Sequence, residues 1–590
     1  MDDGLSDPPE ERNRSTAVLI ASGLAGYCVW RYGGPDWQVA VESAQVIAGI
    51  VEYPHDNPFF IYHWKLWTLL HQVCAIFLWV GVSERALSEV LSGIVGMVTF
   101  QALAIVVYAF SRNVILALAA VAVIVVSRAA QSGVMYPIFM LGTSHTYGAL
   151  GLSVCVLVAG LIACARWRSG LFLLGLAPAI HPSLGVWLAV IVAGCAAWDV
   201  DGVVKSARSG WRYLAAGVLI SGVSLTVHLL VTPPIQSIPA DEAARYLAAF
   251  TTFWDGHRQP VPLFRPGVVL NGAALCLSAL WLTLFRRDLP DPSLFLLRFL
   301  VVSVGVATAC LIASWAPPES LPEWLVILMP GRVLNLAAML FAPLLFGLVG
   351  AYSGRRWGRA TTLGLTFGLL VGAEGVMGVW APPDGFDPRV SRMAVLMAAM
   401  LALIVCRTAE TLTAPRPRVA TPHRARIVNA VLAVVTLIIV GISAWPLPPR
   451  HTAAMRDRLN DSVLGTVARG RGLLLTGGDL HLIQLRTRRP VLLDSGGLDT
   501  LPYALEGARA MERILRDVYG VDLFDPPAEA WKTGMVPPVF NRGVWEQYSP
   551  ERWHEVRTRY QVTQVLTPAG WQLKLPIVAQ NMQFRLHDIP

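Results

Sequence analysis

The most informative stretch of this chain follows its first apolar segment and reads Gly34-Pro35-Asp36-Trp37, then an amphipathic run through Glu42, then Glu52-Tyr53-Pro54-His55-Asp56-Asn57-Pro58. Acidic side chains held against a membrane surface are costly to desolvate, and such residues usually have a function. Here they cluster on the first loop of a long, apolar chain. This placement indicates chemistry at the membrane face rather than a simple pore.

The composition is that of an integral membrane protein. Of the 590 residues, 54% are hydrophobic and only 15% are charged, and the mean hydropathy is +0.53. Soluble proteins carry about 25% charged residues. A spanning helix needs about 20 apolar residues, and the windows of that kind between Ser15 and Trp445 predict about 13 to 15 spans.

The apolar windows place the predicted spans at 15–30, 65–82, 88–108, 113–127, 145–165, 211–231, 267–285, 291–315, 334–352, 360–380, 392–406 and 426–445. Two further segments, 129–142 and 170–198, are interrupted by Pro or Gly. Such breaks are tolerated at membrane depth where protein or water satisfies the freed backbone groups. In the second segment we expect two short limbs that meet at His181-Pro182, near the outer face.

The distribution of charge predicts the topology. The formal net charge is +8, and the basic residues gather in short clusters between spans, which the positive-inside rule places in the cytoplasm. An odd number of crossings then leaves a cytoplasmic tail at 1–14 and puts the C-terminal segment outside. All eight cysteines lie in or beside apolar spans, where they are typical of small buried hydrophobes rather than of disulfides or metal ligands.

The composition changes at 446–590 to that of a soluble domain. Segments 473–476 and 491–494 are expected to form short strands around a helical 479–485, and the tail alternates over 561–567, 571–575 and 584–586. This pattern predicts a small α/β domain on the outer face. The fold class is therefore a polytopic α-helical membrane domain over 15–445, with its first outer loop at 31–64, followed by this domain. A helix lying on the membrane is expected at 39–51.

This organisation resembles the GT-C class of membrane glycosyltransferases. The resemblance rests on the many-span bundle with broken helices, on the soluble C-terminal domain, and on two motifs, Pro35-Asp36-Trp37…Glu42-Ser43-Ala44…Gly49…Tyr53-Pro54 and Tyr560-Gln561-Val562…Val565-Leu566-Thr567-Pro568…Trp571-Gln572-Leu573. The family often has an Asp-Glu or Asp-Asp pair in the first loop, whereas Trp37 follows Asp36 here. Glu42, Glu52 or Asp56 then supplies the second carboxylate, or the partner is absent.

The resemblance implies an enzyme of a bacterial inner membrane that takes a sugar from a polyprenyl-phosphate carrier on the outer face. It assigns the catalytic base to Asp36, whose alternative role is to cap the helix that follows. Glu42 is a second candidate acid, against the alternative of a solvated face. Glu52 and Asp56 are candidate oxygen ligands for a divalent cation, although a Pro-bounded surface loop explains them more simply.

Basic side chains on the outer loops are candidates for binding the donor phosphate. Arg332 follows Pro330-Gly331 at the start of a span, where a helix N-terminus and a guanidinium both attract phosphate; the alternative is an arginine that reaches up to lipid headgroups. The remaining candidates are His257, Arg258, His181, His145 and Lys65. Each also has a possible structural role, such as pairing with Asp255, bonding to a carbonyl or anchoring a span.

Other functions are compatible with the sequence. A transporter or flippase for a lipid-linked substrate is expected to show inverted repeats, and the sequence shows none. A glycan polymerase or ligase shares the architecture and uses Arg and His in place of a loop carboxylate. A non-catalytic assembly subunit is the fourth possibility. The chain has no P-loop, Gly-rich dinucleotide fingerprint or Cys/His metal spacing, which argues against ATP-driven transport by this chain alone.

Overall fold

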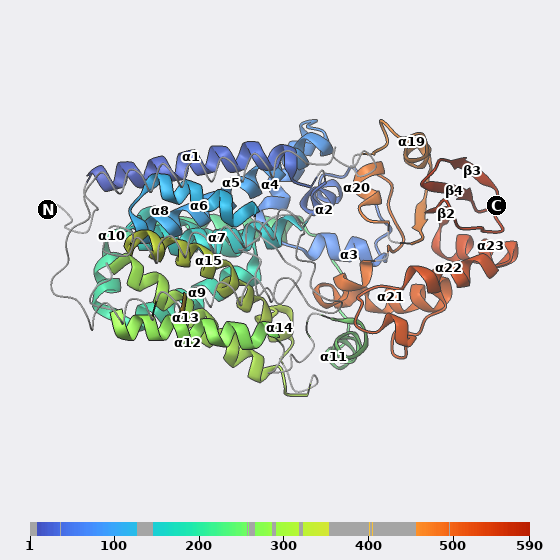
Figure 1. The fold of residues 1–590 in the computed structure, drawn as a ribbon. Coiled ribbons are helices and arrows are strands. Elements are labelled where there is room, and N and C mark those ends of the chain that lie inside the picture. The colour runs from blue at the N-terminus through green and yellow to red at the C-terminus, as the bar shows by residue number, and fades with distance from the viewer. Residues whose placement is uncertain are drawn as a thin grey trace, which may run out of the picture.

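Helices α1 (Pro9–Gly33) and α5 (Glu84–Ser111) lie side by side along most of the apolar bundle (Figure 1). In the computed structural model the described residues are 9–35, 37–126, 145–256, 258, 266–285, 291–317, 322–352, 400–401, 404, 456–478, 480–494 and 496–590. The bundle occupies one end of the molecule and the C-terminal part, from residue 456 onward, occupies the other.

The described helices of the bundle are α1 (Pro9–Gly33), α4 (Leu69–Trp79), α5 (Glu84–Ser111), α6 (Val114–Val126), α7 (Thr146–Ala163), α8 (Trp167–Ile180), α9 (Pro182–Trp198), α10 (Val200–Val231), α12 (Pro266–Phe285), α13 (Asp291–Ala313) and α15 (Val333–Tyr352). Among the described residues, four segments are long and apolar enough to cross a membrane: Glu84–Ser111, Thr146–Ala163, Gly210–Val231 and Ser293–Ala313. Several shorter apolar helices accompany them. Together with the small sheet described below, this confirms the predicted fold class.

Two predictions about the bundle can be compared with the structure. The expected break at His181 is confirmed, because α8 ends at Ile180 and α9 begins at Pro182. The expected span at 65–82 is too long, because α3 ends at Lys65 and Thr68 caps a new helix by accepting a hydrogen bond from the His71 N–H. The broken segment 129–142 and the spans expected at 360–380 and 426–445 lie outside the described residues, as does nearly all of 392–406. The total number of spans therefore stays a prediction.

Short elements connect the bundle to the C-terminal part. They are α2 (Val39–Ile47), α3 (Pro58–Lys65), α11 (Ala240–Ala249), the π-helical turn η2 (Phe250–Trp254), α14 (Glu323–Ile327) and the 3-10 turn η5 (Pro330–Arg332). The prediction that a helix at 39–51 lies on the membrane is wrong in one respect. Helix α2 exists, but its apolar face is buried against α4 and α5, because Ala40, Val41 and Ala44 are small enough for close packing.

The C-terminal part contains α19 (Ser462–Arg469), α20 (Ile483–Thr487), α21 (Ala508–Ile514), α22 (Pro538–Gln547), α23 (Pro550–Tyr560), and the shorter turns η6 (Gly497–Tyr503), η7 (Leu505–Gly507), η8 (Leu515–Tyr519) and η9 (Ala528–Ala530). Its sheet has the order β1-β2-β4-β3, formed by β1 (Leu473–Thr476), β2 (Val562–Pro568), β4 (Phe584–Asp588) and β3 (Ile577–Gln580). Strands β1 and β2 are parallel, and the other two pairs are antiparallel. Where this domain begins in the sequence stays a prediction.

The expected strands at 473–476, 561–567 and 584–586 are confirmed, but two others are wrong. Segment 491–494 forms only an isolated bridge with Leu474, whose N–H donates to the Pro490 carbonyl and whose carbonyl accepts from the Leu492 N–H. The ladder stops there, because the Leu492 carbonyl accepts from the Asn57 amide of the first loop instead. Segment 571–575 is irregular, and the last strand pairs instead with β3 at the sheet edge.

Glycines determine how closely α1 and α5 approach. A Cβ placed on Gly96 would lie 2.4 Å from the Gly26 carbonyl oxygen and 2.2 Å from the Trp30 Cβ. Small residues of this kind let helix backbones pack closely in membranes.

We therefore expect Gly96→Ala to destabilise the protein by about 1–3 kcal/mol through overpacking, lowering the apparent Tm in detergent. Gly222→Ala in α10 is the matched control, because a Cβ there meets nothing within 4 Å and Ala is the better helix former. Equal Tm values for the two variants would show that α1 can move away from α5 without cost.

Candidate active site

Charged residues from distant parts of the sequence meet where the bundle joins the C-terminal part. Glu42 comes from α2, Arg258 follows η2, Arg332 ends η5, and Asp494 and Asp499 come from the C-terminal part. Electrostatic coupling links Glu42 to Asp494, and it links Asp499 to both arginines. The structure thus brings three of the predicted site residues together with two carboxylates that the sequence analysis did not select.

Of the two candidate catalytic carboxylates in the first loop, Glu42 is the one that the structure describes. It keeps some accessible surface, while its neighbours Val41 and Ser43 are buried. Burial, and to a smaller extent the charge of Asp494, raise the pKa of Glu42 to about 8, against the opposite effect of a backbone hydrogen bond from Leu485. Because a general base works best with a pKa near the operating pH, Glu42 is electrostatically suited to exchange a proton. Asp36 lies outside the described residues.

Arg332 provides the cation of the site. Its Nη2 lies 3.4 Å from the Tyr503 hydroxyl, and its Nε is buried with no hydrogen-bond partner among the described residues. A buried N–H without a partner costs free energy, so the guanidinium is ready to receive an acceptor. Arg332 directly precedes α15, as predicted, and its own backbone N–H donates to the Met329 carbonyl at 2.9 Å.

Arg258 has a different environment from Arg332. Its Nη1 donates to Asp255 Oδ2 at 2.5 Å, and both side chains are almost completely buried. Its Nη2 donates to the Tyr503 hydroxyl at 2.9 Å, and its Nε donates to the Val326 carbonyl at 3.3 Å. Of the two roles left open for Arg258, the structure shows the pairing with Asp255. Its binding of phosphate stays a prediction.

Asp494 and Asp499 are the functional candidates that sequence reasoning missed. Desolvation and the charge of Asp255 together raise the pKa of Asp499 to about 7, against the opposite effect of Arg258 and Arg332. The one available signal was local, because Asp494 directly follows the buried run Val491-Leu492-Leu493. No sequence pattern places either residue opposite Glu42, which is more than 400 positions away.

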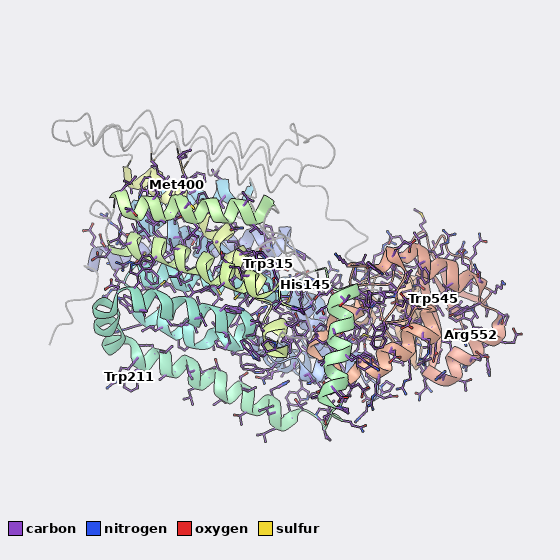
Figure 2. All side chains as sticks on the ribbon, turned by 90° about the horizontal axis from the view of Figure 1, so that it is seen from below. His145, Trp211, Trp315, Met400, Trp545 and Arg552 are labelled. Atoms are coloured by element: carbon purple, nitrogen blue, oxygen red, sulfur yellow. The ribbon has the colours of Figure 1, made fainter. Side chains whose placement is uncertain are left out.

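The remaining predicted site residues are distributed around this cluster. Lys65 ends α3 instead of starting a span, and it forms an ion pair with Glu506 of the C-terminal part. His181 caps α9 through its Nδ1, 3.4 Å from the Leu184 N, and Arg332 is close enough to act on it electrostatically. His145 is exposed at the start of α7, at the end of the bundle that faces the C-terminal part (Figure 2). His257 lies outside the described residues.

The candidate metal ligands do not form a cluster in the described structure. Glu52 and Asp56 are both exposed. Within the described ranges, no three His, Cys, Asp or Glu side chains lie together in an arrangement able to hold a metal ion. The simpler interpretation of this segment as a surface loop agrees with both observations, and metal use stays a prediction.

A buried polar network lies beside Glu42. Ser43 Oγ and His63 Nδ1 are 2.9 Å apart, and His71 bridges Thr68, 2.9 Å from its Nδ1, to the Tyr147 hydroxyl. Buried networks with satisfied hydrogen bonds make a structure rigid. This network connects α2, α3, α4 and α7, and it therefore holds α2, the helix that carries Glu42, in a fixed position.

Comparisons with known proteins concern the overall fold. No protein-family model and no curated protein matches the chain. Two solved structures of ArnT from Cupriavidus metallidurans are similar over the whole length. The one bound to undecaprenyl phosphate has a TM-score of 0.43 at 14% identity, covering 97% of both chains. The apo state has a TM-score of 0.37 at 13% identity, covering 97% of this chain and 96% of that chain.

Both matches extend over nearly the whole of this chain at TM-scores below 0.5, and the GT-C class expected from the sequence stays a prediction. The likeness assigns no substrate to this chain and no role to any of its residues. The roles of Glu42, Arg332 and Asp499 therefore depend on their own geometry.

The raised pKa of Glu42 has a consequence for stability. The folded protein holds the proton up to about pH 8, whereas an ordinary Glu releases it near 4.5. Stability is therefore greatest below the lower value and falls as the pH rises through this window. We expect Glu42→Gln, which cannot ionise, to match the wild type near pH 4 and to exceed it increasingly up to about pH 8.

Apparent Tm in detergent, recorded at a fixed scan rate from pH 4 to 10, measures this difference. Glu529→Gln is the matched control, because Glu529 is exposed in the C-terminal part. A Glu42→Gln curve parallel to the wild-type curve at every pH would contradict the raised pKa.

Proposed function

We propose that this protein is a membrane glycosyltransferase that moves a sugar from a polyprenyl-phosphate carrier to an acceptor hydroxyl on the outer face of a bacterial inner membrane. The observation that carries the proposal is that Arg332, which has a buried and unbonded Nε, and the proton-exchanging carboxyl of Glu42 belong to one cluster, because both act electrostatically on Tyr62. An anion and a hydroxyl are the two groups that this pair is suited to bind. A lipid-linked phosphate brings its anion to the end of an apolar bundle, where Arg332 lies.

The chemistry follows from these two groups. Glu42, in its ionised form, takes the proton from the acceptor hydroxyl as the acceptor oxygen bonds to the anomeric carbon. The bond between that carbon and the phosphate oxygen breaks, and the electron pair stays on the leaving polyprenyl phosphate. Arg332 stabilises the charge that develops there, through a charge-assisted hydrogen bond. Tyr503 lies beside Arg332 and helps to orient it.

The position of the site agrees with an enzyme. The site lies where apolar helices meet a polar domain, so a lipid tail and a water-soluble acceptor can each approach from its own phase. The N-terminus is then cytoplasmic and the C-terminal part lies outside, as the basic clusters predict. A channel or transporter needs no carboxyl contributed by a C-terminal domain at this junction.

The first test is the loss of the base. Removing a general base costs about 10²–10⁴-fold in rate, so Glu42→Gln is expected to lose transfer by that factor. The wild-type rate should rise with pH through about 8 as Glu42 ionises. The measurement is transfer from a panel of labelled polyprenyl-phosphate sugars in detergent, with Glu529→Gln as the control. Asp36→Asn is assayed beside them.

Each outcome of this assay has a clear meaning. Loss in Glu42→Gln with activity retained in Asp36→Asn supports Glu42 as the base. The reverse result transfers the role to Asp36, the residue assigned by the family resemblance. Full activity in both variants would remove the first-loop carboxylates from catalysis, and no transfer with any donor would reject the glycosyltransferase.

The second test concerns the phosphate. Truncating one partner of a buried, hydrogen-bonded charge pair costs about 2–5 kcal/mol, so Arg332→Ala should weaken binding of the donor by that amount. Binding is measured with a labelled donor and with undecaprenyl phosphate as competitor. Arg542→Ala, on the exposed surface of α22, is the control. Unchanged affinity in Arg332→Ala would exclude this residue from the phosphate site.

A further inference from the structure

Two segments that are more than 400 positions apart in the sequence meet beside Glu42. One is α2 and the other is α20 with its flanking residues. Gln45 on α2 donates through Nε2 to the Leu485 carbonyl at 3.1 Å, and Gln484 on α20 donates through Nε2 to the Glu42 carbonyl at 3.0 Å. These bonds join the helix that carries the proposed base to the C-terminal part.

We infer that Gln484 is a positioning residue, which holds Glu42 in place through the backbone of α2 and makes the C-terminal part a component of the active site. Its importance for catalysis rests on the proposed function, whereas its coupling to Glu42 does not. Gln484 touches no reacting atom in this assignment. It acts on the segment that presents the carboxyl.

The bonding of the Gln484 side chain supports this role. Its Nε2 donates to the Glu42 carbonyl and lies 3.3 Å from Gln45 Oε1, and its Oε1 accepts from the Tyr53 hydroxyl at 2.5 Å. A glutamine amide has two N–H donors and one acceptor oxygen, so all its groups are used. The side chain is almost completely buried, and removing it would leave several buried partners without a bond.

Gln484 also binds residues on both sides of the turn at Gly49 in the first loop. Glu42 and Gln45 lie before the turn at Gly49, and Tyr53 lies after it. The same Tyr53 hydroxyl accepts from the Val491 N–H at 3.2 Å, close in sequence to Asp494. One amide thus sets the separation between α2 and the segment that carries Asp494, whose charge acts on Glu42.

The experiment measures the ionisation of Glu42 without depending on enzyme activity. Apparent Tm is recorded in detergent from pH 4 to 10 for the full-length wild type, Glu42→Gln, Gln484→Leu and the double variant. In each background, the difference between the Glu42 and Glu42→Gln proteins stops growing at the pKa of folded Glu42. In the natural background this occurs at about pH 8.

We expect Gln484→Leu to lower the pH at which the difference stops growing by one unit or more, because a loosened α2 lets water reach the carboxyl. A shift of one pH unit is a tenfold change in the proton affinity of Glu42. Gln484→Glu, which adds a second carboxyl beside the first, should raise this pH, and this variant decides the matter if Gln484→Leu does not fold. Gln572→Leu, at an exposed position of the same domain, should leave it unchanged.

The same pH in all backgrounds would overturn the positioning role. The positioning role would also be overturned if Gln484→Leu lowered Tm by the same amount in the natural background and in the Glu42→Gln background at every pH. A residue with a purely structural role would act in that way. If the pH shifts as expected but no donor supports transfer, the proposed function fails while the coupling of Gln484 to Glu42 stands. If transfer is found, its pH–rate profile should shift by the same amount.

Discussion

One buried carboxylate holds the three parts of the molecule together. Glu84 begins α5 of the bundle and accepts from Arg488 Nε, from Arg458 Nη2 at 3.3 Å and from Gln45 Nε2 at 3.2 Å. The two arginines belong to the C-terminal part, and Gln45 belongs to the first loop. Removing one member of such a network leaves the others desolvated and unpaired. The position of α2, and hence of the whole site, depends on this arrangement.

The hydrophobic core extends the same connection over a larger area. The aromatic residues Tyr53, Phe59 and Phe60 of the first loop pack into the core that contains β1, β2 and α21. The segment between α10 and α12 joins this core as well, because the Phe253 and Trp254 carbonyls accept from the Lys532 and Gly534 N–H groups at 2.7 and 2.8 Å. This segment and the first loop therefore belong structurally to the C-terminal part, although the sequence places them between apolar helices.

This arrangement explains what the sequence could predict. Apolar helices, the break at His181 and three of the four strands depend on local periodicity and on single prolines, which can be read in short windows. The strand expected at 491–494 ends after its bridge to Leu474, because the Leu492 carbonyl accepts from Asn57, which is far away in the sequence. For the same reason Glu42 and Arg332 could be selected by residue type and position, whereas Asp494, Asp499 and Gln484 could not.

The balance of charge separates the roles of the two arginines. Asp255 is completely buried against Arg258, which neutralises that cation within the protein. Asp499 is coupled to Arg332 electrostatically, and its pKa is raised to about 7, so that this carboxyl is partly protonated near neutral pH. Around Arg332 the protein therefore supplies less negative charge than an ionised Asp499 would give. The proposed function uses this excess of positive charge at Arg332 to bind the phosphate of the carrier.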